Sequence, residues 1–275
     1  MPDATKPEDR VDSAMSALRS LHEGDRGVGA AASLGRDALP ALRELLFERD
    51  PSGLFETRRR AVDALALIGA HEVLIEFLQS SRESTDAVER LGEDAIVNAA
   101  ARALRGLDDP RVYSLLVSLA EQKILPGVIV ALGAFQRAES IPCLVAALAE
   151  DESRPAAEAA LRDFGARARN ALAEAARSTP TADLEGESRL RQRRSALALL
   201  DRIGIESDGW AELRDVMRDC DPIARRLACQ ICLNYAPRTE YPEALAILNQ
   251  LSSTASTLER IEIDQALAIT KRRTH

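Results

Sequence analysis

The chain has few lysines, aromatic residues and cysteines. Of its 275 residues only 3% are aromatic, and only Lys6, Lys123 and Lys271 are lysines. Proteins that stack nucleotide bases need aromatic side chains, and this chain also has a formal net charge of −8, so its composition argues against nucleic acid as the main partner. Its four cysteines are too few for the disulfide framework of a small secreted domain.

Membrane segments and catalytic motifs are also missing from the sequence. No stretch approaches the roughly eighteen consecutive apolar residues of a transmembrane helix, and the start, MPDATKPEDR, has neither the basic nor the apolar part of a secretory signal. We therefore expect a cytoplasmic protein that does not contact a membrane. The motifs GxGxxG, GxSxG, HExxH and the P-loop are absent as well. We expect no enzymatic activity, no cofactor and no metal.

The chain does contain a repeated helical pattern: a small residue, Leu four positions later, and a bulky apolar residue three positions after that. We call the Leu position the anchor. The anchors are Leu34, Leu65, Leu104, Leu132, Leu161, Leu200 and, with cysteine in place of leucine, Cys232. A period of about thirty residues with helical spacing inside each unit predicts stacked helical pairs.

The second helix of each pair is predicted between the anchors. The predicted segments are Leu39–Leu46, Val73–Leu78, Val112–Leu119, Ile141–Leu148, Ala171–Ala176, Trp210–Met217 and Ala244–Leu251. Pro40, Pro142 and Pro242 stand near the start of three of them, where a missing N–H costs no hydrogen bond. We predict a loose tail over 1–7 and one domain over 8–275, with terminal capping helices.

The pattern Arg-x-x-Ala-x-x-x-Leu, followed by a Pro-x-Leu helix, resembles the HEAT-like repeats, particularly the short bacterial type also found in phycobilin lyases. The resemblance extends from about Gly27 to Leu251. It implies an all-α fold, a right-handed α-solenoid of about seven HEAT-like helical hairpins. Since such folds serve many functions, the resemblance implies no particular activity.

HEAT repeats often carry an arginine early in the second helix that pairs with an aspartate of the preceding turn. The residues at this position, seven before the anchor, are Arg58, Arg154, Arg193 and Arg225, and their expected partners are Asp50, Asp151 and Asp219 or Asp221. The other copies have Gly27, Val97 and Leu125 there, which predicts an interrupted ladder. We interpret these arginines as structural.

The CxxC formed by Cys229 and Cys232 invites a zinc or redox interpretation. Cys232, however, stands at an anchor position, and Cys229 lies one turn earlier on the same predicted helix. A redox CxxC needs a helix N-terminus to lower the pKa of its thiol. We therefore predict that both cysteines are buried as small apolar residues.

Three parts of the chain depart from the regular repeat. Two repeats are 39 residues long, with polar extra residues in 79–93 and 178–190, and insertions in a solenoid usually form rim loops that often bind. A neutral insertion is the alternative. The third departure is the uncharged segment 124–135, which is either more covered than its counterparts or exposes an apolar patch.

A candidate binding face follows from the register. Positions six and two before the anchor and one after it point away from the core, on the face that is concave in HEAT-like arrays. The candidate partner-binding residues are Arg59, Asn98, Arg102, Arg105, Val130, Arg162, Arg194, Arg226 and Gln230. This arginine-rich stripe suits an acidic partner, because guanidinium groups bind carboxylates and phosphates. The alternative is a solvated face whose arginines pair with Asp63, Asp201 and their neighbours.

The leading functional hypothesis is a non-enzymatic scaffold or adaptor that binds another protein, through an acidic segment, on this face. One alternative is nucleic-acid binding by the same arginine stripe, including a protein that resembles the HEAT-like alkylpurine DNA glycosylases. A second alternative is a chromophore protein similar to the phycobilin lyases. The sequence leaves the partner and the oligomeric state open.

Overall fold

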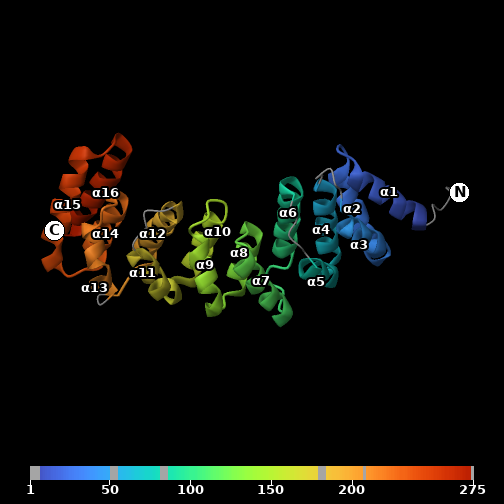
Figure 1. Cartoon of the computed structure of the whole chain (residues 1–275), viewed down its shortest axis with the longest axis horizontal. Coiled ribbons are helices and arrows are strands. Elements are labelled where there is room, and N and C mark those ends of the chain that lie inside the picture. Colours follow the sequence, from blue (N-terminus) through green and yellow to red (C-terminus); the bar gives the residue numbers. More distant parts are fainter. Residues whose placement is uncertain (1–6, 50–54, 81–85, 179–183, 207–208, 274–275) are drawn as a thin grey trace. The chain divides into compact units, whose positions relative to one another are not determined.

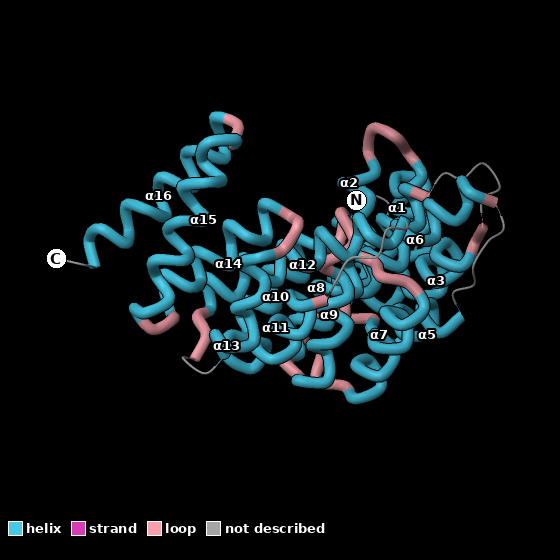
Figure 2. The backbone as a smooth tube through the Cα atoms, turned by 60° about the vertical axis from the view of Figure 1, so that its left-hand side comes forward, coloured by secondary structure: helices cyan, strands magenta, loops and turns pink. Residues whose placement is uncertain are grey.

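The computed structural model describes residues 7–49, 55–80, 86–178, 184–206 and 209–273 (Figure 1). Within these ranges helices joined by loops make up the chain, and no strand is present (Figure 2). Helix α1 (Pro7–Arg19) begins the described part, so all but the last residue of the predicted tail 1–7 lies outside the described residues.

Seven helices carry the anchors or end beside them, and we call them the anchor helices. They are α2 (Gly24–Leu34), α4 (Glu56–Ile68), α6 (Ala87–Ala103), α8 (Pro126–Phe135), α10 (Arg154–Phe164), α12 (Leu184–Ile203) and α14 (Pro222–Tyr235). The helices between them are α3 (Leu39–Phe47), α5 (His71–Ser80), α7 (Pro110–Gln122), α9 (Ile141–Ala147), α11 (Arg169–Arg177), α13 (Gly209–Leu213) and α15 (Tyr241–Thr254). Helix α16 (Thr257–Arg273) follows. The predicted helices are confirmed, with Trp210–Met217 divided between α13 and a 3-10 turn, Arg214–Arg218.

The chain forms two compact units, Met1–Phe135 and Gln136–His275. In the first unit each anchor helix packs on the next, from α2 to α8, while α3 contacts α5 and α5 contacts α7. In the second unit α10, α12, α14 and α16 pack in the same sequential way, and α9, α11 and α13 do likewise. Each unit therefore contains two rows of helices in which chain neighbours are spatial neighbours.

The repeated pattern fills the core. From the second copy onward, both the small residue and the anchor are completely buried, as in Ala61 and Leu65 or Ala228 and Cys232. The first copy differs: Ala30 is exposed and Leu34 half-buried, while Gly24, Gly27 and Ala31 are the buried residues of α2. The prediction of the same register in the first copy is wrong, because α2 turns a glycine face toward α1 to allow close packing.

The two long repeats place most of their extra residues in helices. Helix α6 begins at Ala87 and α12 at Leu184, so the anchor helices are extended toward their N-termini. The expectation of rim loops is therefore wrong for 87–93 and 184–190, while 81–85 and 179–183 lie outside the described residues. Asp86 begins α6 as its N-cap, because its carboxylate accepts from the N–H groups of Val88 and Glu89 at 2.8 and 3.0 Å.

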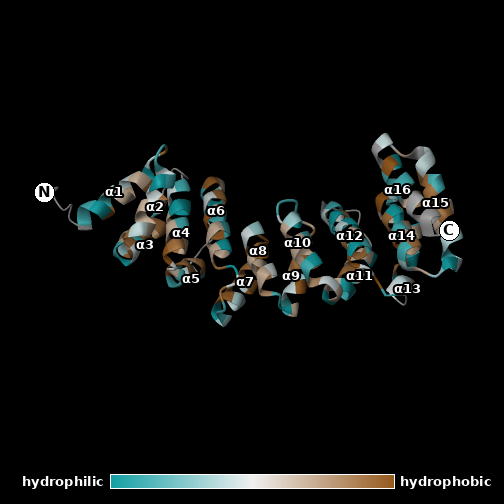
Figure 3. Ribbon diagram, turned by 180° about the vertical axis from the view of Figure 1, so that it is seen from behind, coloured by the Kyte–Doolittle hydropathy of each residue, from teal (hydrophilic) through white to brown (hydrophobic). Residues whose placement is uncertain are grey.

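Helix α8 lies unusually close to α6. A Cβ atom on Gly127 would come within 2.3 Å of the backbone oxygen of Asn98, so the approach requires glycine. Except for exposed Ala134, the apolar side chains of α8 are buried or half-buried, and in Figure 3 this helix lacks the teal of α6. Of the two interpretations of the uncharged segment 124–135, the more covered helix is confirmed.

The close contact at Gly127 predicts opposite effects of two glycine substitutions. We expect Gly127→Ala to lower the free energy of unfolding by roughly 1–3 kcal/mol, because the methyl group overpacks the α6–α8 contact. A Cβ atom on Gly29, inside α2, would meet no atom within 4 Å, so Gly29→Ala should raise stability by about 0.5–1 kcal/mol. Urea unfolding of both variants checks this, and equal effects would contradict the close helix contact.

Candidate partner-binding site

Arginines connect three of the anchor helices, α4, α10 and α12, to the helix before each. The Nε atoms of Arg58, Arg154 and Arg193 donate to the carbonyl oxygens of Leu46, Leu148 and Ala176 at 2.8, 2.9 and 2.7 Å. These carbonyls lie at the C-terminal ends of α3, α9 and α11, where the last turn of a helix leaves carbonyl groups without partners. The positive charge of the guanidinium group also interacts favourably with the negative C-terminal end of the helix dipole. The interpretation of these three arginines as structural is confirmed.

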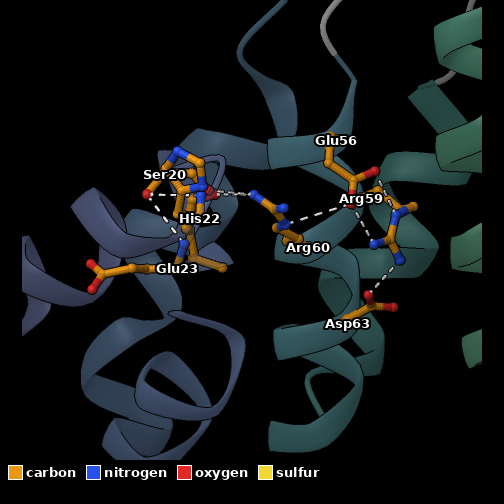
Figure 4. Close-up of polar contacts among 8 residues, drawn as sticks. Ser20, His22, Glu23, Glu56, Arg59, Arg60 and Asp63 are labelled. Carbon is orange, nitrogen blue, oxygen red and sulfur yellow. Dashed lines mark hydrogen bonds and ion pairs between the residues drawn. The ribbon is translucent and has the colours of Figure 1, made fainter. Parts of the chain in front are cut away.

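Arg60 makes the same kind of contact with α1. Its Nη1 donates to the carbonyl oxygens of Leu18 and Ser20 at 3.1 and 2.8 Å (Figure 4). The side chain passes over Gly24, where a Cβ atom would come within 1.9 Å of the guanidinium carbon. This arginine was not predicted, because it stands two residues beyond the ladder position.

The acidic partners of the ladder differ from the prediction. Arg154 pairs with Asp151 as expected, and Asp50 lies outside the described residues. Arg58, however, pairs with buried Glu93 of the following anchor helix. Asp219 forms an ion pair with Arg193 at 2.7 Å, and Asp221 forms one with Arg194. Neither aspartate is therefore the ion-pair partner of Arg225. The prediction for Arg225 is wrong, because both carboxylates turn back toward the preceding repeat.

Three of the candidate residues, all six before an anchor, contact the next anchor helix or the last helix. The side-chain oxygen of Asn98 accepts from the N–H of Gly127 at 2.6 Å, at the start of α8. Arg194 forms two hydrogen bonds of 2.8 Å with Asp221, the N-cap of α14. Arg226 pairs with Glu262 of α16 at 2.9 Å and donates to Gln230 at 3.1 Å. These three side chains link neighbouring helices, so their polar groups are already bonded within the chain.

Arg59 is paired within its own helix. It binds Glu56 at 2.6 Å and Asp63 at 2.9 Å (Figure 4). The hydrogen bond from Arg59 lowers the pKa of Glu56, whereas burial raises the pKa of Asp63. For Arg59, Arg194 and Arg226, the predicted alternative of a self-paired face therefore describes the structure.

The other three candidate arginines are Arg102, Arg105 and Arg162. All three are exposed, and none has an ion pair with another described residue. Arg102 is in the last turn of α6, Arg105 follows in the turn after it, and Arg162 belongs to α10 of the second unit. Val130 is half-buried in α8. The candidate site of the first unit thus centres on α6.

The same side of α6 exposes apolar residues that were not among the candidate partner-binding residues. Val88 is 60% exposed and Leu91 is 67% exposed. Their spacing from Ala95, Asn98 and Arg102 alternates between three and four residues, which places them on one helix face. They were missed because they lie in the stretch expected to be a loop; continuing the stripe spacing backward from Asn98 would have found them.

Polar contacts fix α6 to its neighbouring helices. Glu93 is 8% exposed and pairs with Arg58 of α4, and Asp94 pairs with Lys123 at the end of α7. Together with the bond from Gly127 to Asn98, these contacts attach α6 to the helices on both sides. The exposed face is therefore presented by a firmly held helix.

Both cysteines of the CxxC are completely buried, as predicted. Burial raises the pKa of the Cys229 thiol and of the Cys232 thiol to about 12. Their thiols are therefore neutral and poorly nucleophilic near neutral pH. Across the described residues no group of three or more His, Cys, Asp or Glu side chains is placed to hold a metal ion.

None of the described helices has the length and apolar character needed to cross a membrane. Comparison of the chain with protein-family models and with curated proteins finds no match.

The contact between Arg194 and Asp221 predicts a loss of stability when it is removed. Burial acts to raise the pKa of Asp221, but the hydrogen bond and charge of Arg194, with the N–H groups of Ile223 and Ala224, outweigh it and lower the pKa. We expect Arg194→Met to reduce the free energy of unfolding by about 1–3 kcal/mol at pH 7, because a buried carboxylate loses its partner.

The matched control is Arg162→Met, which should change stability by less than about 0.5 kcal/mol. Because the folded-state pKa of Asp221 is lowered, its stabilising contribution is present above the unfolded pKa and is lost as the pH falls through the folded value. The difference between wild type and Arg194→Met should therefore shrink below about pH 4. Urea unfolding at pH 7 and pH 3.5 tests both points, and equal stability of the two variants would refute them.

The cysteines should differ strongly in reactivity. Cys220 is exposed, so a thiol reagent at pH 8 should label it in the native protein. Cys229 and Cys232 should be labelled only after unfolding in guanidinium, because they are buried and their thiolates are scarce. Peptide mass spectrometry identifies the labelled positions. Labelling of Cys229 or Cys232 at the rate of Cys220 would contradict burial.

Proposed function

We propose that the chain is a HEAT-like α-solenoid that acts as a non-enzymatic scaffold or adaptor, and that it binds an acidic segment of another protein at Arg102 and Arg105. The sequential packing of helices within each unit supports the solenoid. The observation that carries the binding site is the pair of exposed arginines at the end of α6 that have no ion pair with another described residue. In a chain of net charge −8, such a pair is a local positive feature.

Arg102 and Arg105 differ from many other arginines of the described chain, which form ion pairs with carboxylates. Many ion pairs among the described residues join neighbouring helices, such as Arg43 with Glu76, Arg177 with Glu212, and Arg218 with Glu243. Arg102 and Arg105 have no such carboxylate among the described residues around them. A planar guanidinium group binds a carboxylate through two parallel hydrogen bonds, so two such groups one turn apart suit two carboxylates of a partner.

The proposal predicts that reversing these charges abolishes partner binding. The double variant Arg102→Glu/Arg105→Glu should recover at least about tenfold less partner from a lysate of the native organism than wild type, because attraction becomes repulsion at two contacts. Binding to wild type should also weaken as salt is raised from about 50 to about 300 mM, because added salt shortens the screening length. Quantitative mass spectrometry of the captured proteins measures both effects.

Arg90→Glu is the matched control. Arg90 is exposed on the same helix, lies off the binding face, and has no ion pair with another described residue, so this variant should capture as much partner as wild type. Unchanged recovery with the double variant would refute the proposed site. Duplex DNA binding at low salt that requires Arg102 and Arg105 would instead favour the nucleic-acid alternative.

A further inference from the structure

The outward face of α6 changes in character along its length. The residues on this face, at spacings of three and four, are Val88, Leu91, Ala95, Asn98 and Arg102, and Arg105 continues the spacing in the turn that follows the helix. The first two are exposed aliphatic side chains, the next two are half-buried, and the last two are exposed arginines. We call these six residues the α6 stripe. Its spacing is that of the seam along which one helix packs on another.

The corresponding stripe of α12 provides a comparison within the chain. Helix α12 is the other lengthened anchor helix. Four of its six corresponding positions are the charged residues Glu187, Arg191, Arg194 and Asp201, and the other two are Leu184 and Ala198. Arg191 contacts Glu187 and Asp151, while Arg194 contacts Asp221. Asp201, in the position of Arg105, accepts from Asn234 at 2.8 Å. At the position of exposed Leu91, lengthened α12 therefore carries a paired glutamate, Glu187, in place of an apolar side chain.

We propose that the α6 stripe binds an amphipathic helix of the partner protein, antiparallel to α6. Its acidic N-terminal half would lie on Arg102 and Arg105, and its apolar C-terminal half on Val88 and Leu91. This inference rests on the proposed function and specifies the partner segment. The charge pattern determines the direction, because acidic residues are favoured near the N-terminus of a helix. Apolar anchors at helical spacing are the usual way in which a helix binds such a face.

The length of the stripe sets the size of the partner segment. From Val88 to Arg105 the face spans about 26 Å, at about 1.5 Å per residue, which requires a partner helix of about 18 residues. Only the apolar half buries hydrophobic surface, and the basic half adds contacts that salt weakens. A partner helix that is apolar throughout would leave both arginines without carboxylates, and a uniformly acidic one would leave Val88 and Leu91 exposed.

The test measures binding of two fluorescent helical peptides of about 18 residues to the full chain by anisotropy. The matched peptide has Glu at the stripe positions of its N-terminal half and Leu at those of its C-terminal half. The second peptide has the same composition, with Glu and Leu alternating along the stripe. We expect the matched peptide to bind at least about tenfold more tightly, since alternation misplaces both kinds of contact.

Two double variants identify the contacts. Each of them, Val88→Ser/Leu91→Ser and Arg102→Glu/Arg105→Glu, should weaken the binding of the matched peptide by at least about tenfold. Leu67→Ser and Arg90→Glu are the controls, because Leu67 is 69% exposed on α4 and Arg90 is exposed off the stripe. A matched peptide with Lys in place of Glu should regain binding to Arg102→Glu/Arg105→Glu. All substituted residues are exposed, and circular dichroism verifies folding.

The helix proposal would be overturned if the two peptides bound equally. It would also be overturned if Val88→Ser/Leu91→Ser left the binding of the matched peptide unchanged. It would also be overturned if wild type dimerised in sedimentation velocity and Val88→Ser/Leu91→Ser abolished the dimer, since a second copy would then cover the stripe. These outcomes are separate from failure of the proposed function. A captured partner that depends on Arg102 and Arg105 but not on Val88 and Leu91 would leave the scaffold proposal intact and exclude the helix.

Discussion

The hydrogen bond from an arginine Nε to a carbonyl at the end of the preceding helix recurs at three anchor helices of the described chain. Arg58, Arg154 and Arg193 make it from equivalent positions. The bond supplies a partner for a carbonyl group that a helix end leaves unsatisfied, and it ties the next anchor helix to that helix end. Lysine does not reproduce this geometry, because its donors share one nitrogen, whereas the rigid planar guanidinium directs Nε to the carbonyl and leaves separate nitrogens for a carboxylate. The near absence of lysine from the sequence agrees with this use of arginine.

Much of the helical arrangement could be predicted from the sequence, because a single register explains it. Placing Cys232 at an anchor was enough to predict that it is buried, and Pro40 and Pro142 mark helix starts within a residue. The failures occurred where local pattern and packing disagree. The glycines of α2 move its buried face by one residue, and the polar stretch before Glu93 forms helix although its composition resembles a loop.

The candidate site was less predictable, because exposure and pairing depend on neighbouring helices. Arg102 and Arg194 look alike in sequence, yet only Arg194 faces a carboxylate, which Asp221 supplies from the next repeat. Asn98 could not be recognised as the partner of Gly127 without the close approach of α8. Periodicity therefore selects the residues that point outward, while the spacing between repeats decides which of them remain available to another molecule.

The attachment of α6 to its neighbouring helices has a consequence for the rate and the affinity with which its exposed face can bind another chain. A surface that is already ordered loses little conformational entropy on association, so most of the interaction energy of a contact can appear as affinity. Glu93, Asp94 and Asn98 hold the backbone beneath the exposed side chains in place before any encounter. Any ordering required by association would then fall on the incoming chain, and the geometry of α6 would act as its template.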